Sequence, residues 1–173
     1  MSEALFDDTA RPTDPVGRTL DGLSRLFAIC SGLMLTAMAL MSVYSIIGRS
    51  FFDKPLMGDY ELVQMMSAVA VTMALPFCQM VKGHVIVDFF TARNSPRANA
   101  VLDTMASVLL AVCAFAIAWR VTVATFDFAK NHDASMLLNL PTWWGYAPMG
   151  PSFFLLGCAG LYTAWCQAKA IRA

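Results

Sequence analysis

Long uncharged stretches dominate the pattern of hydrophobic and polar positions along this chain. Residues 26–48 and 62–81 contain no Asp, Glu, Lys or Arg, and the same is true of residues 134–168. A helix needs about 17–25 mostly apolar residues to cross a bilayer. The first two stretches are 23 and 20 residues long. They therefore predict membrane-spanning helices at 26–48 and 61–81.

A shorter uncharged stretch, residues 104–119, predicts a third span. Sixteen helical residues cover about 24 Å, less than the roughly 30 Å of a hydrocarbon core. The neighbouring residues are mostly apolar, and the long side chain of Arg120 can reach the headgroups from a position near a helix end. We therefore expect one helix over 98–128.

The last uncharged stretch is too long for one span and is divided by Pro141, Pro148 and Pro151. Proline is tolerated in the first turn of a helix, where its missing N–H has no partner to lose. The pattern favours a fourth span at 149–168, preceded by a surface segment at 134–147.

Composition agrees with a membrane protein, because 58% of the residues are hydrophobic and only 14% are charged. Soluble domains carry about 25% charged residues. Lys and Arg flanking the spans indicate the orientation. Eight of them lie in the tail at 1–25, the second loop and the C-terminus, and four lie on the other side. We expect an all-α integral membrane protein with four spans and both ends in the cytoplasm. The acidic start of the chain argues against a cleaved signal.

Four residues near helix ends are candidates for subunit contacts or structural ion pairs. Arg49 ends the first span and Glu61 opens the second, where each charge suits the helix dipole. These two could form a salt bridge, or each could serve its own helix end alone. His84 and Asp88 stand four apart in a segment that predicts an interfacial amphipathic helix at 83–92. They could pair with each other or contact a partner protein.

The segment 134–147 contains an aromatic cluster. Trp and Tyr gather where a membrane meets water. The cluster either anchors the protein in this belt or provides a docking surface for a partner outside. Its candidate residues are Pro141, Trp143, Trp144 and Tyr146.

The predicted spans lack the ionisable groups that a transport pathway needs. No charged residue lies mid-span in the first, second or fourth helix, and no repeat with matching broken helices is present. The spans instead carry small residues four apart, which allow helices to approach closely. These pairs are Ala70/Ala74, Ala114/Ala118 and Gly160/Ala164.

Three motifs, in this order and spacing, carry a family resemblance. They are Gly48-Arg49 with Phe52 and Gly58-Asp59-Tyr60-Glu61-Leu62, then Lys82-Gly83-His84-Val85-Ile86-Val87-Asp88, then Leu140-Pro141-Thr142-Trp143 with Pro148-Met149-Gly150. The chain resembles, over about residues 25–168, the small permease subunit (Q-type, DctQ-like) of tripartite ATP-independent periplasmic (TRAP) transporters. Val85, where isoleucine is commoner, and the second proline Pro151 depart from the family pattern.

The resemblance implies a multi-pass protein of the bacterial inner membrane that is not an enzyme and needs no cofactor. Its expected partners are a large M-type permease subunit, which holds the substrate and sodium sites, and a periplasmic binding protein that delivers an organic acid. The small subunit is expected to act as a scaffold within the lipid bilayer. No metal site and no nucleic-acid partner is expected.

Other four-span proteins fit the sequence less well. A disulfide-generating oxidoreductase needs cysteine pairs in outer loops, whereas all five cysteines lie in predicted spans. A small multidrug exporter needs a carboxylate within the membrane, and a haem subunit needs histidines at that depth. The first span has no carboxylate, and the two histidines lie in loops. A structural subunit of another membrane complex remains the alternative.

Overall fold

The computed structural model describes residues 15–52, 58–81, 96–136 and 138–172. The predicted interfacial helix at 83–92, with His84 and Asp88, lies outside the described residues. Within them the secondary structure is helical apart from an isolated bridge between Ala134 and Pro141. The predicted all-α class is confirmed.

Five helices are found in the described part of the chain, and the longer ones extend past the predicted spans. They are α1 (Pro15–Phe52), α2 (Asp59–Met80), α4 (Pro96–Asn131), α5 (Trp143–Tyr146) and α6 (Met149–Arg172). Helix α1 begins well before residue 26, inside the segment expected as a tail. An ion pair four residues apart supports its first turns, because Arg25 Nε lies 3.0 Å from Asp21 Oδ2.

Three of the described helices, α1, α2 and α4, are long and apolar enough to cross a membrane. Helix α6 is of comparable length but carries Tyr162, Thr163 and Gln167 along its course. It is not among these three candidate spans. A fourth span at α6 therefore stays a prediction.

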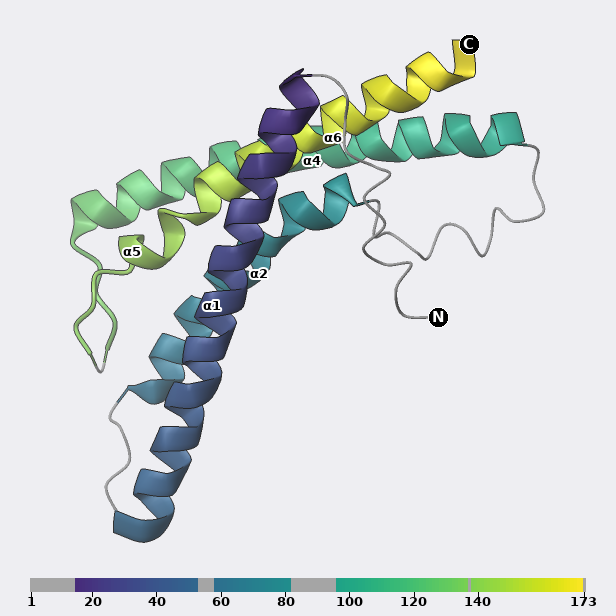
Figure 1. Cartoon of the computed structure of the whole chain (residues 1–173). Helices are drawn as coiled ribbons and strands as arrows, with labels where there is room; N and C mark the ends of the chain where they lie inside the picture. The colour runs from purple at the N-terminus through teal and green to yellow at the C-terminus, as the bar shows by residue number, and fades with distance from the viewer. Residues whose placement is uncertain (1–14, 53–57, 82–95, 137, 173) are drawn as a thin grey trace.

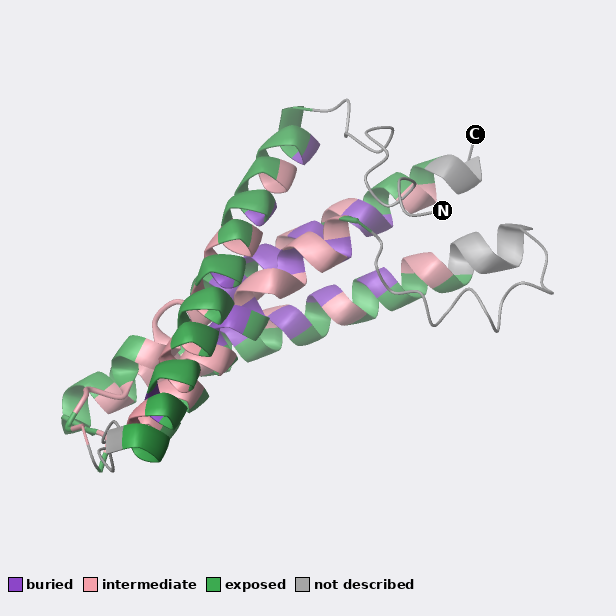
Figure 2. Ribbon diagram, turned by 60° about the horizontal axis from the view of Figure 1, so that its bottom comes forward, coloured by how far each residue is buried: buried purple, intermediate pink, exposed green. Residues whose placement is uncertain are grey.

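The described helices form two antiparallel pairs, α1 with α2 and α4 with α6 (Figure 1). The end of α1 and the loop that follows α4 lie toward the same end of the molecule. The start of α1 and the end of α6 lie toward the other end. Helix α2 contacts both α1 and α6, so it joins the two pairs. Buried positions concentrate where α2, α4 and α6 meet, while α1 is largely exposed (Figure 2).

Small residues bring α4 and α6 together. Ala111, Ala114 and Ala118 of α4 are buried, as are Ala159 and Ala164 of α6. A Cβ atom added at Gly160 would lie 3.2 Å from both the Ala111 Cβ and the Ser107 carbonyl oxygen. In a bilayer, where lipid tails are as apolar as side chains, such close approach is a main source of helix association. Both members of the pairs Ala114/Ala118 and Gly160/Ala164 are buried, which agrees with the predicted packing role. In the pair Ala70/Ala74, Ala70 is buried and Ala74 is half-buried.

Helix α1 packs against α2 through a seam with a seven-residue spacing. Ser31 and Ser45 are buried two heptads apart, with half-buried Met38 between them. The Ser31 hydroxyl donates a hydrogen bond of 2.7 Å to the Ala70 carbonyl. The Ser45 hydroxyl donates to the Asp59 carboxylate. The short side chains therefore combine close packing with hydrogen bonds between the helices.

Helix α2 contains an interior proline, Pro76, whose side chain is fully buried. Proline lacks the N–H that would continue the helical ladder, and it bends helices. Figure 1 shows that α2 changes direction along its course and runs toward α4 and α6. Beyond the proline, the buried Gln79 donates through Nε2 to the Thr163 hydroxyl at 3.0 Å. The bend thus brings the end of α2 into hydrogen-bonding contact with α6.

The close packing of α4 and α6 along their seam predicts that replacing glycine with leucine changes stability very differently at Gly160 and at Gly32. Gly160→Leu should lower the stability of the purified chain by about 1–3 kcal/mol, because the seam has no space for the side chain. Gly32→Leu should leave stability unchanged or raise it, since nothing lies within 4 Å of a Cβ there and leucine is the better helix former. Thermal unfolding in detergent measures both, and equal melting temperatures would contradict the packing described here.

Candidate functional site

A carboxylate from one helix pair is bound by the loop of the other. Glu61 lies in the first turn of α2. Its Oε2 accepts hydrogen bonds from the Ser135 hydroxyl and from the Leu138 backbone N–H, the latter at 3.3 Å. We call these three residues the Glu61 latch. Arg49, the predicted partner of Glu61, lies exposed in the last turn of α1, and that ion pair stays a prediction.

Gly58 shapes the surface on which the loop rests. It precedes α2 with φ 80°, in the left-handed region that glycine adopts without strain. A Cβ atom at this position would overlap the Leu138 side chain. The Gly58 carbonyl accepts the Leu62 N–H at 3.1 Å and so starts the helix. In the sequence, Gly58 stands directly before the acidic first turn of α2. This pattern alone does not indicate that the loop around Leu138 packs against it.

The loop between α4 and α5 has its own hydrogen bonds. The Ser135 N–H donates to the Leu140 carbonyl at 2.8 Å, and the Thr142 N–H donates to the Asp133 carbonyl at 3.0 Å. His132 and Asn139 have φ values of 52° and 55°. Non-glycine residues rarely adopt this left-handed conformation. The loop is therefore folded back on itself rather than extended.

The predicted aromatic residues lie in and beside α5, and they face different ways. The Tyr146 ring packs on Phe128 of α4, with centroids 4.9 Å apart. The rings of Trp143 and Trp144 meet edge to face at 6.1 Å, and Trp144 is 61% exposed. Gly145 lies against Met65 of α2, and Pro141 forms the bridge to Ala134. Thus Tyr146 fixes α5 to α4, while Trp144 is available to a membrane boundary or a partner.

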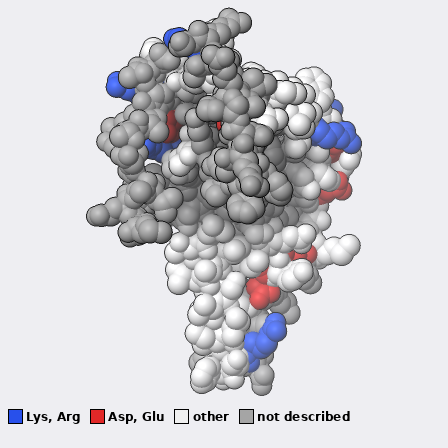
Figure 3. All heavy atoms as spheres, turned by 90° about the vertical axis from the view of Figure 1, so that its right-hand side faces the viewer, with Lys and Arg blue, Asp and Glu red and all other residues white. Residues whose placement is uncertain are grey.

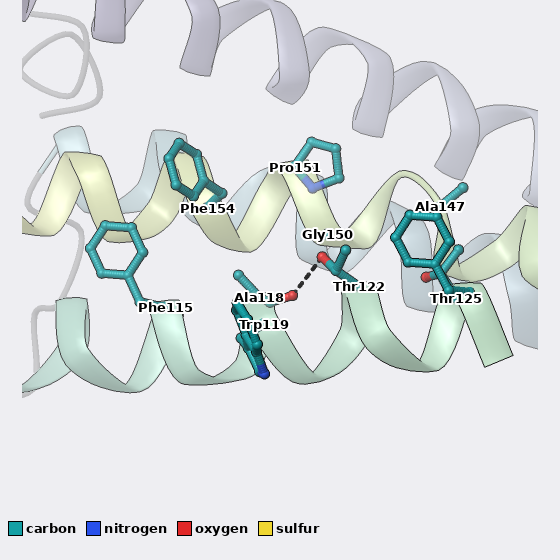
Figure 4. Close-up of a pocket in the computed structure, with 10 residues that line it drawn as sticks. Phe115, Ala118, Trp119, Thr122, Thr125, Ala147, Gly150, Pro151 and Phe154 are labelled. Atoms are coloured by element: carbon teal, nitrogen blue, oxygen red, sulfur yellow. Dashed lines mark hydrogen bonds between the residues drawn. The ribbon is translucent and has the colours of Figure 1, made fainter.

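An open groove of about 750 Å³ lies between α4 and the α5–α6 region. Figure 4 shows Phe115 and Trp119 from α4 on one side and Pro151 and Phe154 from α6 on the other. The Thr122 hydroxyl is already bonded to the Ala118 carbonyl at 2.7 Å. The residues lining the groove include none with a charge. Its walls suit an apolar occupant rather than a charged solute.

The described residues contain no group of His, Cys, Asp or Glu that could hold a metal ion. Large apolar side chains are exposed instead, including Leu33, Leu40 and Tyr44 on α1. On the face shown in Figure 3, uncharged side chains cover the lower part of the molecule apart from a few charges along one edge. Apolar surfaces of this extent mark contacts with a membrane or another protein.

The contact between Gly58 and Leu138 makes a prediction about two substitutions. Gly58→Ala should destabilise the chain by about 1–2 kcal/mol from backbone strain alone, and further because it overlaps Leu138. Adding Leu138→Ala should relieve the overlap, so the double variant should be more stable than the sum of the single effects predicts. Thermal unfolding of the four chains measures this coupling, with Gly22→Ala as a control at an open helical position. Simple additivity would show that the two residues do not meet.

Comparison with known proteins assigns the family. No curated protein and no solved structure matches the chain. Residues 38–170 match the family described as tripartite ATP-independent periplasmic transporters, DctQ component. The match covers α2, the Glu61 latch, α4 and nearly all of α6. The chain therefore belongs to the DctQ component family of tripartite ATP-independent periplasmic transporters.

Proposed function

We propose that this chain is the small, non-conducting membrane subunit of a TRAP transporter and that it scaffolds the large M-type permease. The observation that carries this proposal is how the polar side chains between the helices are used. Several of them bond to neighbouring helices of the same chain, and broad apolar faces remain exposed for a membrane partner. This pattern supports a subunit whose role is to pack against a larger membrane protein.

Three hydrogen bonds illustrate this use of polar groups. Ser31 bonds to Ala70 between α1 and α2, and Gln79 bonds to Thr163 between α2 and α6. Ser107 donates to Gln167 at 3.3 Å between α4 and α6. A pathway for a charged solute usually needs ionisable groups at membrane depth. These interior contacts are neutral, which supports a role outside the transport pathway.

The arrangement of the helix pairs supports four spans with both chain ends in the cytoplasm. Helix α6 has 24 residues, or about 36 Å at 1.5 Å per residue, which is long enough to cross. Four crossings require the α1–α2 turn and the α4–α5 loop to lie on the same side. The Glu61 latch joins the first turn of α2 to the α4–α5 loop directly. Lys and Arg favour the other side as the cytoplasm.

The exposed face of α1 and the groove beside α4 are the proposed surfaces for the large permease and lipid. Leu33 and Leu40 are each 67% exposed, so α1 has apolar surface far beyond what α2 covers. The family name supports a periplasmic system that does not use ATP. In this proposal a sodium gradient drives uptake of an organic acid across the bacterial inner membrane, delivered by the binding protein.

The segment around α5 would lie at the periplasmic boundary. Trp143 and Trp144, with Pro141 before them, would anchor the protein in the aromatic belt and offer a contact for the binding protein. Tyr146 would hold the segment in place through Phe128. Arg49, His84 and Asp88 would serve contacts with the other subunits, while Glu61 acts within the chain.

Co-purification tests the scaffold proposal. The tagged chain, expressed with the large permease of its own transporter, should retain that permease through detergent extraction and size exclusion. Replacing Leu33 and Leu40 together with Asn should reduce the retained permease, because buried amides without partners are costly. Replacing the exposed Met136 of the loop with Asn is the matched control and should not reduce it. Purification of the native chain without any large membrane partner would contradict the proposal.

A further inference from the structure

We infer that Glu61 is a structural latch that fastens the α4–α5 loop to α2 and locks the two helix pairs into one rigid unit. The inference rests on the proposed scaffold function, because a scaffold must keep its shape while its partner moves. It assigns to Glu61 a role within the chain, in the contact between α2 and the α4–α5 loop.

The bonding of Glu61 supports a latch. A single carboxylate oxygen accepts both the Ser135 hydroxyl and the Leu138 N–H. These donors come from positions 74 and 77 residues further along the chain, so the contact joins distant segments. Hydrogen bonds to an ionised acceptor are about twice as strong as neutral ones. The contact is partly buried, which reduces competition from water.

The α4–α5 loop has a folded shape of its own, and contacts with α2 set the position of the loop. His132 and Asn139 both adopt positive φ values. Such conformations persist when the surrounding structure over-determines them. Hydrogen bonds within the loop fix its shape, whereas the Glu61 bonds and the seat of Leu138 on Gly58 fix its place against α2.

Helix α2 is hydrogen-bonded to the second helix pair near both of its ends, and the Glu61 latch is the connection at its start. Gln79 and Thr163 form a direct hydrogen bond between α2 and α6, near the end of α2 away from Glu61. A connection at one end would permit the helix pairs to pivot about it. Connections at both ends prevent this movement. Loss of Glu61 should therefore loosen the pairs at the latch end and leave the Gln79 end joined.

A disulfide placed beside the latch can report this movement. The Met65 Cβ lies 3.7 Å from the position of a Cβ at Gly145, within the range of about 3.5–4.5 Å found in disulfides. We would introduce Met65→Cys and Gly145→Cys into the full chain, with its five native cysteines replaced by alanine. The chain would be expressed with the large permease, and the rate of oxidative cross-linking would be measured in membranes.

Glu61→Ala should slow cross-linking by about tenfold or more, as expected from losing charge-assisted hydrogen bonds. Glu61→Gln keeps an acceptor oxygen without the charge and should have a smaller effect. Asp127→Ala removes an exposed carboxylate from α4 and should leave the rate unchanged. Equal rates for Glu61→Ala and the parent chain would overturn the latch.

A second measurement covers the case in which the chain without native cysteines does not fold. Hydrogen exchange at the Leu138 amide can be followed in the otherwise native chain, with and without Glu61→Ala. Faster exchange in the variant supports the latch, and unchanged exchange overturns it. Failure of the native chain to co-purify with the permease would contradict the scaffold function separately, because neither latch measurement depends on that result.

Discussion

Hydrogen bonds from polar side chains that lie between helices connect the helices of this structure, as they do in other membrane proteins. The Ser31 hydroxyl donates to the Ala70 carbonyl, and Gln79 donates to Thr163. At the edge of the apolar region, Glu61 accepts a hydrogen bond from the loop that follows α4. Each hydrogen bond joins a different pair of segments. Together they place α2 at the centre, bonded to α1 on one side and to α6 and the loop on the other.

Close packing and these hydrogen bonds depend on each other. Glycine and alanine in the α4–α6 seam allow the backbones to approach, which brings Ser107 within reach of Gln167. The bend associated with Pro76 turns α2 toward α6, which brings Gln79 to Thr163. These polar side chains thereby bond within the chain, whereas the buried Ser24 hydroxyl has no hydrogen-bond partner among the described residues. The surfaces that remain exposed are mainly apolar, as expected for a subunit of a larger membrane assembly.

The helices could be predicted from the sequence because uncharged stretches of membrane-spanning length carry a strong signal. The small-residue pairs of α4 and α6 also indicated their packing faces. The start of α1 at Pro15 could not be predicted from that signal, because its first turns combine apolar residues with Arg18, Asp21 and Arg25. Their helical state depends on local pairing, not on an apolar stretch.

The contact between Glu61 and the α4–α5 loop could not be predicted from local sequence patterns. Glu61 and Arg49 are close in sequence and opposite in charge, so an ion pair between them was one of two predictions, and it stays a prediction. Two donors to Glu61 lie 74 and 77 residues away, and only the tertiary fold brings them near. One of the three motifs that indicated the family lies at this point, since Gly58 and Glu61 belong to the first, and the loop that they contact leads directly into the third.

The central claim is that this subunit is a rigid scaffold for a moving partner, and distances between spin labels test it most directly. Labels at the exposed Tyr60 of α2 and the exposed Met136 of the loop report the separation of the two helix pairs in the complex with the large permease. One narrow distance distribution, the same with and without sodium, is the predicted result. Two populations whose balance shifts with sodium would show that this subunit moves during transport, and would contradict the account.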